Sequence, residues 1–218
     1  ILFTVSLNAQ ILPSQQATHY KKNSNPPGSR AFNNCSKAGS YGPSQSDCNT
    51  AYASSDLNGE VTVTNGIQYW TAPATGTYTI TAIGATAGNT NELSQSVGHA
   101  AKLTGDFSLT QGTVLKILVG QHGWMASTRP GWGAGGGTFV TKNDNTILLI
   151  SGGAGSAHTT YAGPFIYNSV VYQDASLTTS GNVAPNSTGA GTDGSGGSSG
   201  NGGAGAGYSG NGTKGNNA

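Results

Sequence analysis

The sequence carries little charge. Lys, Arg, Asp and Glu together make up 8% of its 218 residues, whereas a typical soluble domain has about 25%. Nine basic residues are balanced by eight acidic ones, and only Lys21 and Lys22 form a basic doublet. A protein that binds nucleic acid through its phosphates needs a basic patch or stripe. The composition therefore excludes that class and predicts no nucleic-acid partner.

Cysteine is scarce as well, because Cys35 and Cys48 are the only two. A lone pair among turn residues, in a chain rich in Gly, Ser, Thr and Asn, predicts a disulfide in an exported protein. A zinc site would need two more soft ligands at short spacing, and the sequence offers none. Three glycosylation sequons add weak support for an extracellular, secreted or cell-surface location; they begin at Asn34, Asn186 and Asn211.

Long apolar runs are missing. The segment Ile1–Ala9 is too short to span a bilayer as a helix. It is either the remainder of a secretory leader cleaved near Ala9 or an ordinary first strand. Residues 10–33 are polar and contain Pro13, Pro26 and Pro27, as expected of a linker. We assign residues 1–33 to a leader remnant or linker, and residues 34–218 to one domain.

Helical periodicity is almost absent. One short helix is predicted from Ser44 to Tyr52, with Ser44 as N-cap and Asp47 at the third helical position. Cys48, Ala51 and Tyr52 would then share a face, which places the helix beside the disulfide.

What the chain does contain is alternation. The segment Gly66–Ala85 predicts a strand, a turn and a strand, and hence a hairpin. The alternating residues are Ile67, Tyr69 and Thr71 in the first strand and Tyr78, Ile80 and Ala82 in the second, with Pro73 and Gly76 between them. Such alternation gives each strand one buried and one solvated face, which suits an antiparallel sheet.

Further short strands follow in close order, which predicts a mainly β sandwich or jelly roll. They are expected at Glu60–Thr64, Ala101–Leu109, Thr113–Val119, Gly137–Lys142 and Thr146–Ser151. Asn143-Asp144-Asn145 is typical of a hairpin turn. Leu148-Leu149-Ile150 is apolar on both faces, which predicts a central strand covered on both sides.

Glycine dominates after Ser151. The chain has 36 glycines in 218 residues, more than twice the usual share of about 7%. Phe165–Tyr172 is expected to form one more strand or an ordered loop. The tract Gly189–Gly215 is either a flexible linker or a set of packed polyproline-II-like helices. We assign residues 152–218 to a glycine-rich layer and expect it to be incomplete at Ala218.

Several of these motifs together resemble the glycine-rich domain of anaplastic lymphoma kinase and leukocyte tyrosine kinase ectodomains. They are Cys35–Tyr52 with Tyr41-Gly42-Pro43, Gly66–Trp70, Pro73–Tyr78, Gly84-Ala85, Leu118–Gly123, Gly135–Val140, Leu148–Ile150 and Gly207–Gly210. The resemblance implies a tumour-necrosis-factor-like antiparallel β-sandwich with glycine-rich insertions folded as polyglycine helices. It also implies an extracellular, non-enzymatic module that takes part in binding small protein ligands. The ligand-binding role does not carry over to particular residues.

Motifs typical of catalysis and cofactor binding occur, but a chain this rich in glycine contains such matches by chance. Gly131–Gly136 and Gly205–Gly210 fit a dinucleotide fingerprint, but neither precedes a predicted helix. Gly196–Gly200 fits a hydrolase elbow, but no histidine follows it. The four histidines are expected in exposed loops; they are His19, His99, His122 and His158. The sequence predicts no enzyme, no metal and no cofactor.

The aromatic residues provide the candidate binding site. Trp124, Arg129 and Trp132 lie in the loop Gln121–Gly136, and exposed Trp and Arg are frequent anchors of binding surfaces. The alternative is that they pack on the end of the sandwich, while Tyr69 and Trp70 supply core and sheet surface. We therefore expect a structural or interaction module at a cell surface, in a matrix or in a filament. Self-association is one expected mode of interaction. The alternatives are an adhesin or receptor domain that binds a protein or glycan, and, with less support, an ice-binding surface.

Overall fold

The computed structural model describes residues 3–6, 28–38, 41–87, 98–123, 133–161 and 167–177. For β1, and for residues 156–173, only the backbone is considered below. The described elements are one helix and a set of antiparallel strands. In chain order they are β1 Phe3–Ser6, β2 Arg30–Phe32, α1 Gln45–Ala51, β3 Val61–Thr64, β4 Ile67–Thr71, β5 Gly76–Ile83, β6 Lys102–Leu109, β7 Val114–Leu118, β8 Thr138–Lys142, β9 Ile147–Ser151, β10 Gly155–Tyr161 and β11 Tyr167–Gln173.

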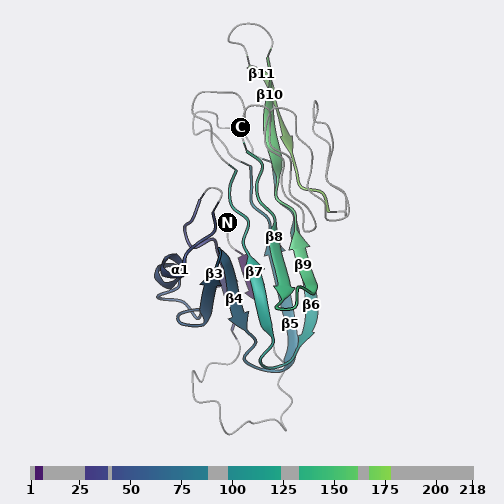
Figure 1. The fold of residues 1–218 in the computed structure, drawn as a ribbon. Coiled ribbons are helices and arrows are strands. Elements are labelled where there is room, and N and C mark those ends of the chain that lie inside the picture. The colour runs from purple at the N-terminus through teal and green to yellow at the C-terminus, as the bar shows by residue number, and fades with distance from the viewer. Residues whose placement is uncertain are drawn as a thin grey trace.

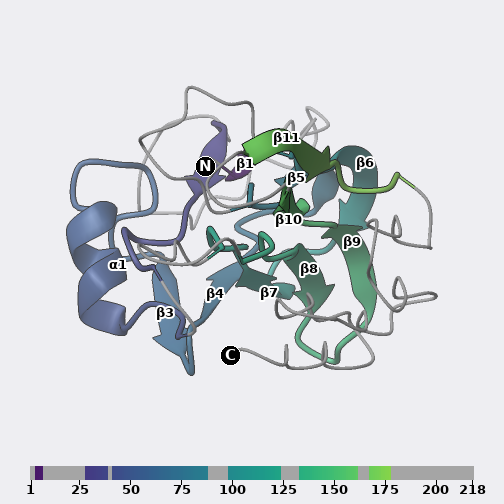
Figure 2. The same ribbon diagram turned by 90° about the horizontal axis from the view of Figure 1, so that it is seen from above.

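The strands form two larger sheets and one ribbon. The five-stranded sheet has the order β3-β4-β7-β8-β9, the four-stranded sheet has the order β2-β1-β5-β6, and β10 pairs with β11. Seen from above, the first sheet faces β1, β5 and β6 of the second (Figure 2). The ribbon lies beyond one end of the strands, with α1 beside β3 (Figure 1). The mainly β, antiparallel prediction is confirmed.

The predicted hairpin of Gly66–Ala85 is wrong, although both of its strands exist. β4 pairs with β3 and β7 in one sheet, and β5 pairs with β1 and β6 in the other. The connection around Pro73 therefore carries the chain from one sheet to the other. The reason is that β4 finds its partner β7 only after the chain has made β5 and β6, and no local pattern reports that pairing.

One hydrophobic core lies between the two sheets. It contains Tyr78 and Ile80 from β5 together with Trp70, Leu115 and Val140 from the facing sheet, all at most 2% exposed. The predicted alternation of Tyr78, Ile80 and Ala82 is confirmed, because all three are completely buried. Phe32 contacts Trp70 edge-to-face at 6.3 Å, and Trp70 contacts Tyr78 in the same way at 6.2 Å.

In β4 the inward face is the opposite of the one that the alternation indicated. Gln68 and Trp70 are buried at 1% and 2% exposure, while Ile67 and Tyr69 are half-buried on the outer face. Trp70 is the largest side chain of the strand, so it takes the core position and Gln68 follows it inward. Gln68 is tolerated there because both the oxygen and the nitrogen of its amide are hydrogen-bonded, as described below.

The hairpin of β8 and β9 is confirmed, but β9 is not a central strand. The turn uses Asn145 with a φ of 69°, and Lys142 N donates to Thr146 O at 2.8 Å. Among the described residues β9 has β8 as its only sheet partner and closes the five-stranded sheet. Its residues 148–150 are half-buried, and Ile147 is 47% exposed. The apolar run therefore belongs to an edge strand.

The N-terminal region contains strands where a linker was expected. Of the two interpretations of Ile1–Ala9, the structure shows a strand, since Phe3–Ser6 pairs with β2 and β5. Arg30–Phe32 is the strand β2, and Phe32 is completely buried in the core. Short, polar-flanked strands of this kind have no periodic pattern of their own, so the sequence did not distinguish them from a linker.

Two features complete the fold. β11 covers most of the segment Phe165–Tyr172, and its partner β10 was not predicted.

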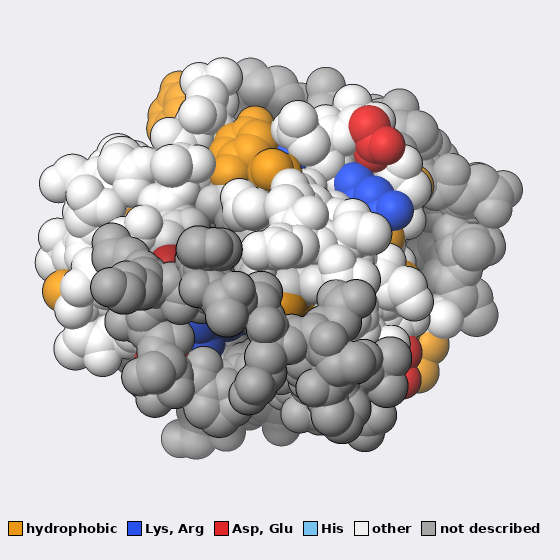
Figure 3. Space-filling view, turned by 90° about the horizontal axis from the view of Figure 1, so that it is seen from below, with side chains coloured by type: hydrophobic (Ala, Val, Ile, Leu, Met, Phe, Trp, Pro, Cys, Tyr) orange, Lys and Arg blue, Asp and Glu red, His pale blue; other side chains and the backbone are white. Residues whose placement is uncertain are grey.

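The surface matches the composition. Seen from below, the described part is mostly uncharged, with few Lys, Arg, Asp or Glu side chains and only scattered hydrophobic ones (Figure 3).

Candidate interaction site

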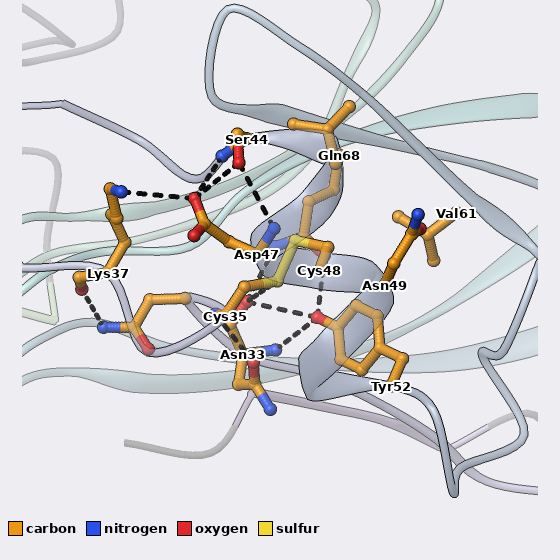
Figure 4. Close-up of a disulfide and its surroundings, with 12 residues drawn as sticks. Asn33, Cys35, Lys37, Ser44, Asp47, Cys48, Asn49, Tyr52, Val61 and Gln68 are labelled. Carbon is orange, nitrogen blue, oxygen red and sulfur yellow. Dashed lines mark hydrogen bonds and ion pairs between the residues drawn. A yellow bond between two sulfur atoms is a disulfide. The ribbon is translucent and has the colours of Figure 1, made fainter.

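The disulfide and the short helix form one rigid unit at the edge of the five-stranded sheet. Cys35 and Cys48 are joined, and both are at most 3% exposed. The helix begins as predicted: Ser44 Oγ accepts from Asp47 N at 3.2 Å, and Asp47 Oδ2 accepts from Ser44 N at 2.7 Å. This reciprocal pair is a capping box. Figure 4 shows it beside the disulfide, with Lys37 approaching Asp47 at 3.2 Å.

The same contacts perturb Asp47. Its pKa is lowered from 3.8 to about 2, chiefly because the carboxylate accepts the Ser44 backbone N–H, and further because of the Ser44 hydroxyl and Lys37. Hydrogen bonds to the charged form of a carboxyl favour that form. The charge at Asp47 therefore serves the helix N-terminus.

A buried polar network ties α1 to both sheets. Tyr52 Oη donates to Gln68 Oε1 at 2.7 Å and accepts from Asn33 N at 2.9 Å. Gln68 Nε2 donates to Asn33 O at 2.7 Å. Burial raises the pKa of the Tyr52 hydroxyl. Because Asn33 follows β2 and Gln68 belongs to β4, the network fixes the two sheets relative to the helix (Figure 4).

An ion-pair cluster lies nearby. Arg30 is 3.3 Å from Asp56 and 3.5 Å from Glu60, and Glu60 also accepts from Trp70 Nε1 at 3.3 Å. These groups hold the turn before β3 against β2. Arg30 Nε is buried and makes no hydrogen bond among the described residues, so its contact with Glu60 is an ion pair alone.

The ends of the strands give way to closely packed glycine segments. We call the segments 84–87, 120–123, 133–137 and 152–154 the glycine layer. Four backbone hydrogen bonds join them: Ala85 N to Gly136 O at 2.8 Å, Gly136 N to Gln121 O at 2.9 Å, Gly135 N to Ala154 O at 2.8 Å and Ala154 N to Ala85 O at 2.9 Å. Segments far apart in the sequence thus share one backbone network outside the sheets.

Only glycine fits several positions of this layer. A Cβ on Gly135 would lie 2.0 Å from Ala85 O, and one on Gly153 would lie 2.1 Å from Gly135 O. Distances this short do not occur for real Cβ atoms, and the obstacle is backbone, which cannot rotate away. The glycines therefore allow chain-to-chain contact, as glycine does in other tightly packed backbones.

Two buried hydroxyls close the layer against the sheets. Thr138 Oγ1 donates to Ile83 O at 2.7 Å and accepts from Gly120 N at 3.0 Å. Ser151 Oγ accepts from Gly84 N at 3.2 Å and donates to Ala101 O. Both side chains are completely buried. A hydroxyl residue at the boundary between an apolar strand and a glycine run was the available sequence signal, and sequence reasoning missed it.

The described part of the glycine layer draws mainly on segments outside the predicted range 152–218. Three of its four segments precede residue 152, and of the expected range 152–218 only 152–154 contribute to the described layer. The tract Gly189–Gly215 lies outside the described residues. Single glycines at strand ends, such as Gly84 and Gly120, are the sequence feature that indicates these segments of the layer. Composition instead favoured the tract with the most glycine.

The predicted binding loop is described only at its two flanks. Trp124, Arg129 and Trp132 lie outside the described residues, whereas Gln121–Gly123 and Gly133–Gly136 belong to the glycine layer. Gln121 Nε2 donates to the carbonyl of Tyr41 at 3.0 Å, and Tyr41 is 83% exposed. The two flanks of the loop are thus held by the glycine layer, and Gln121 lies beside an exposed aromatic residue.

The histidines occupy different environments. His99 Nδ1 is 3.1 Å from Asp174 Oδ1, and both side chains are mostly exposed. Exposed His122 lies 3.1 Å from Thr86 Oγ1. His158 lies within β10 rather than in a loop, and His19 lies outside the described residues. In the part of the chain that the structure describes, no three His, Cys, Asp or Glu side chains are close enough to hold a metal ion.

Of the three sequon asparagines, Asn34 lies among the described residues. Asn34 is half-buried, and its Nδ2 donates to Lys37 O at 2.6 Å. Asn186 and Asn211 lie outside the described residues. None of the described helices is long and apolar enough to cross a membrane.

A disulfide-bonded, antiparallel β domain of this kind fits an extracellular or cell-surface location. The comparison with known proteins agrees. Over 129 residues the chain is 33% identical to the leukocyte tyrosine kinase receptor of Mus musculus. The aligned region makes up 56% of this chain and 14% of the receptor. The shared region belongs to the extracellular part of that receptor. No protein-family model matches the chain.

Proposed function

We propose that this chain is a non-enzymatic extracellular module with a structural or interaction role at a cell surface, in a matrix or in a filament. The observation that carries the proposal is the region of 129 residues shared with a receptor. The disulfide supports it, because such bonds persist in oxidising compartments. The chain spans 14% of that receptor's length, so the receptor's kinase activity is not part of the proposal.

The fold proposed for the module is a tumour-necrosis-factor-like jelly roll. Its support is the path of the chain: β4 and β7 are neighbours in one sheet, while β5 and β6, which lie between them in the sequence, pair in the other. Greek-key crossings of this type build jelly rolls.

We further propose that the glycine layer is made of polyproline-II-like helices. Its support is a spacing of three residues, the length of one turn of such a helix. A Cβ on Gly120 would meet Gly136 O at 2.2 Å, and three residues later a Cβ on Gly123 would meet Gly133 O at 1.9 Å. The two segments therefore run antiparallel and touch once per turn.

A second candidate function is recognition of a protein ligand or glycan through Trp124, Arg129 and Trp132. The exposed residue Tyr41 beside the flank of this loop favours the recognition function, because aromatic side chains anchor binding surfaces. An ice-binding surface is the third, less supported candidate, and thermal hysteresis of the purified protein would test it.

The experiment for the proposed function is secretion followed by partner screening. The chain, expressed with an added leader, should accumulate in the medium with no free thiol. Displayed as multimers on arrays of extracellular proteins and glycans, it should bind at least one of them or itself. Trp132→Ala should abolish binding to an arrayed protein or glycan and leave self-association unchanged, while Asp106→Asn on the outer face of β6 should change neither. Retention in the cell with reduced cysteines, or silence on both arrays and in self-association, would contradict the proposal.

A further inference from the structure

The two edges of the five-stranded sheet are protected unequally. At the β3 edge, the side chain of Gln45 takes the place of a neighbouring strand. Its Oε1 accepts from Val63 N at 2.7 Å, and its Nε2 donates to Val61 O at 3.0 Å. Gln45 is the first residue of α1, which lies beside β3 (Figure 1). Gln45 therefore occupies two backbone groups of this edge, Val63 N and Val61 O, and obstructs the pairing of another chain there.

The β9 edge has no comparable cap among the described residues. Ile147–Ser151 pairs with β8 alone, and no described side chain bonds the backbone of Ile147–Ile150 as Gln45 does at β3. The strand contains no charge, no proline and no glycine. Natural sheets commonly protect edges with charged residues, proline, bulges or a covering element.

Two features limit the open stretch. The register shifts between Val140 and Thr141, which leaves Leu148 as an extra residue in β9 and bends the strand there. At the other end, Ala101 N donates to Gly152 O at 3.0 Å and closes the edge against the chain before β6. The open edge is thus the short stretch Ile147–Ile150, which includes the bend at Leu148.

The remaining edges differ from β9 in charge. β6 carries Lys102 and Asp106, and β2 carries Arg30. Charges on an edge disfavour pairing with a second chain. β9 is the one edge strand of the two larger sheets, as described, that lacks both a charge and a side-chain cap.

We propose that β9 pairs antiparallel with β9 of a second copy of this chain, across a two-fold axis. The order Ile-Leu-Leu-Ile is the same in both directions, so every residue of the stretch meets an Ile or Leu. No like charges are brought together. Two-fold pairing is the commonest symmetry of homo-oligomers, and strand addition supplies backbone hydrogen bonds that side-chain contacts alone do not.

The outer face of the sheet supports this choice of partner. The cross-strand neighbours Leu118, Phe139 and Ile150 form one apolar row from β7 to β9. Pairing at β9 would continue this row into the second copy. The inference deepens the proposed function, and rests on it only in assuming that the module makes protein contacts.

The test is the oligomeric state of the full chain, measured by sedimentation from about 10 µM to about 1 mM, where weak contacts associate. The wild type should form dimers as the concentration rises. Ile147→Lys places a charge on the open edge and should raise the dimer Kd at least about tenfold. Thr62→Lys is the matched control, since Thr62 is an exposed residue of the capped edge strand β3, and it should dimerise like the wild type.

A second variant separates edge pairing from other contacts. Gln45→Ala removes the β3 cap and creates a second open edge, so assemblies larger than dimers should form, while Ile147→Lys combined with Gln45→Ala should stop at dimers. A wild type that stays monomeric throughout would overturn the inference, as would a dimer unaffected by Ile147→Lys. Far-UV circular dichroism of each variant confirms that it is folded. Binding on the arrays through Trp132 is a separate result, so failure of either proposal can be recognised without the other.

Discussion

The glycine layer makes a quantitative prediction at Gly153. In Gly153→Ala the new methyl group would lie 2.1 Å from Gly135 O and 2.4 Å from Gly135 C. An ordinary contact starts near 3.4 Å, so the two segments must separate by roughly 1 Å, an overpacking that costs about 1–3 kcal/mol. That separation also strains the bonds from Gly135 N to Ala154 O at 2.8 Å and from Ala154 N to Ala85 O at 2.9 Å, each of which contributes about 1 kcal/mol.

We therefore expect Gly153→Ala to lower the free energy of unfolding by about 3 kcal/mol, which for a chain of this size lowers the Tm by roughly 6–12 °C. The matched control is the adjacent Gly152→Ala, whose Cβ would meet only Ala175 Cβ at an ordinary 3.7 Å. That variant should be neutral or more stable by up to about 1 kcal/mol, because alanine restricts the unfolded chain. Differential scanning calorimetry measures both. Equal Tm values for the two variants would refute the packing argument.

Three further predictions follow from the unit around the disulfide. Replacing Cys35 and Cys48 with Ala should cost about 3 kcal/mol on the chain-entropy account, measured by urea unfolding, and a loss below about 1 kcal/mol would show that the loop is held by other contacts. Tyr52→Phe should lower the free energy of unfolding by about 1–3 kcal/mol, because Gln68 Oε1 loses its buried donor. An unchanged midpoint in the same assay would contradict the stabilising role of this hydrogen bond. Asp47 has a folded-state pKa of about 2, below the usual 3.8, so its contribution to stability is present above pH 3.8 and is lost as the pH falls through 2. Asp47→Asn should therefore reduce the decline of Tm between pH 4 and pH 2, and a variant with the wild-type pH profile would argue against the capping role.

Local chemistry was predictable from the sequence. Ser44 and Asp47 predicted the start of the helix, because a capping box depends only on residues three apart in the sequence. The alternation of Tyr78, Ile80 and Ala82 identified the buried face of β5 for a similar reason. The turn at Asn143–Asn145 likewise needed only residues that tolerate left-handed backbone.

Long-range pairing was not predictable. Pro73 and Gly76 mark a connection, but whether it turns within a sheet or crosses to another depends on β7, which lies more than 40 residues later. The apolar run Leu148–Ile150 has the same composition as a central strand, and only the absence of a further neighbour among the described strands makes β9 an edge. Within the candidate site, glycine density did not indicate the segments of the described layer, because packing at Gly84, Gly120, Gly135 and Gly153 depends on which strands end side by side.

The ordered, hydrogen-bonded glycine layer holds both flanks of the proposed binding loop. Amide hydrogen exchange measured residue by residue tests it most directly, because exchange protection reports stable backbone hydrogen bonds. We expect the amides of Ala85, Gly135, Gly136 and Ala154, which all donate within the layer, to exchange as slowly as those of the core strand residues Ile80 and Ile117. Exchange at the rate of an unstructured chain at these four amides would contradict it.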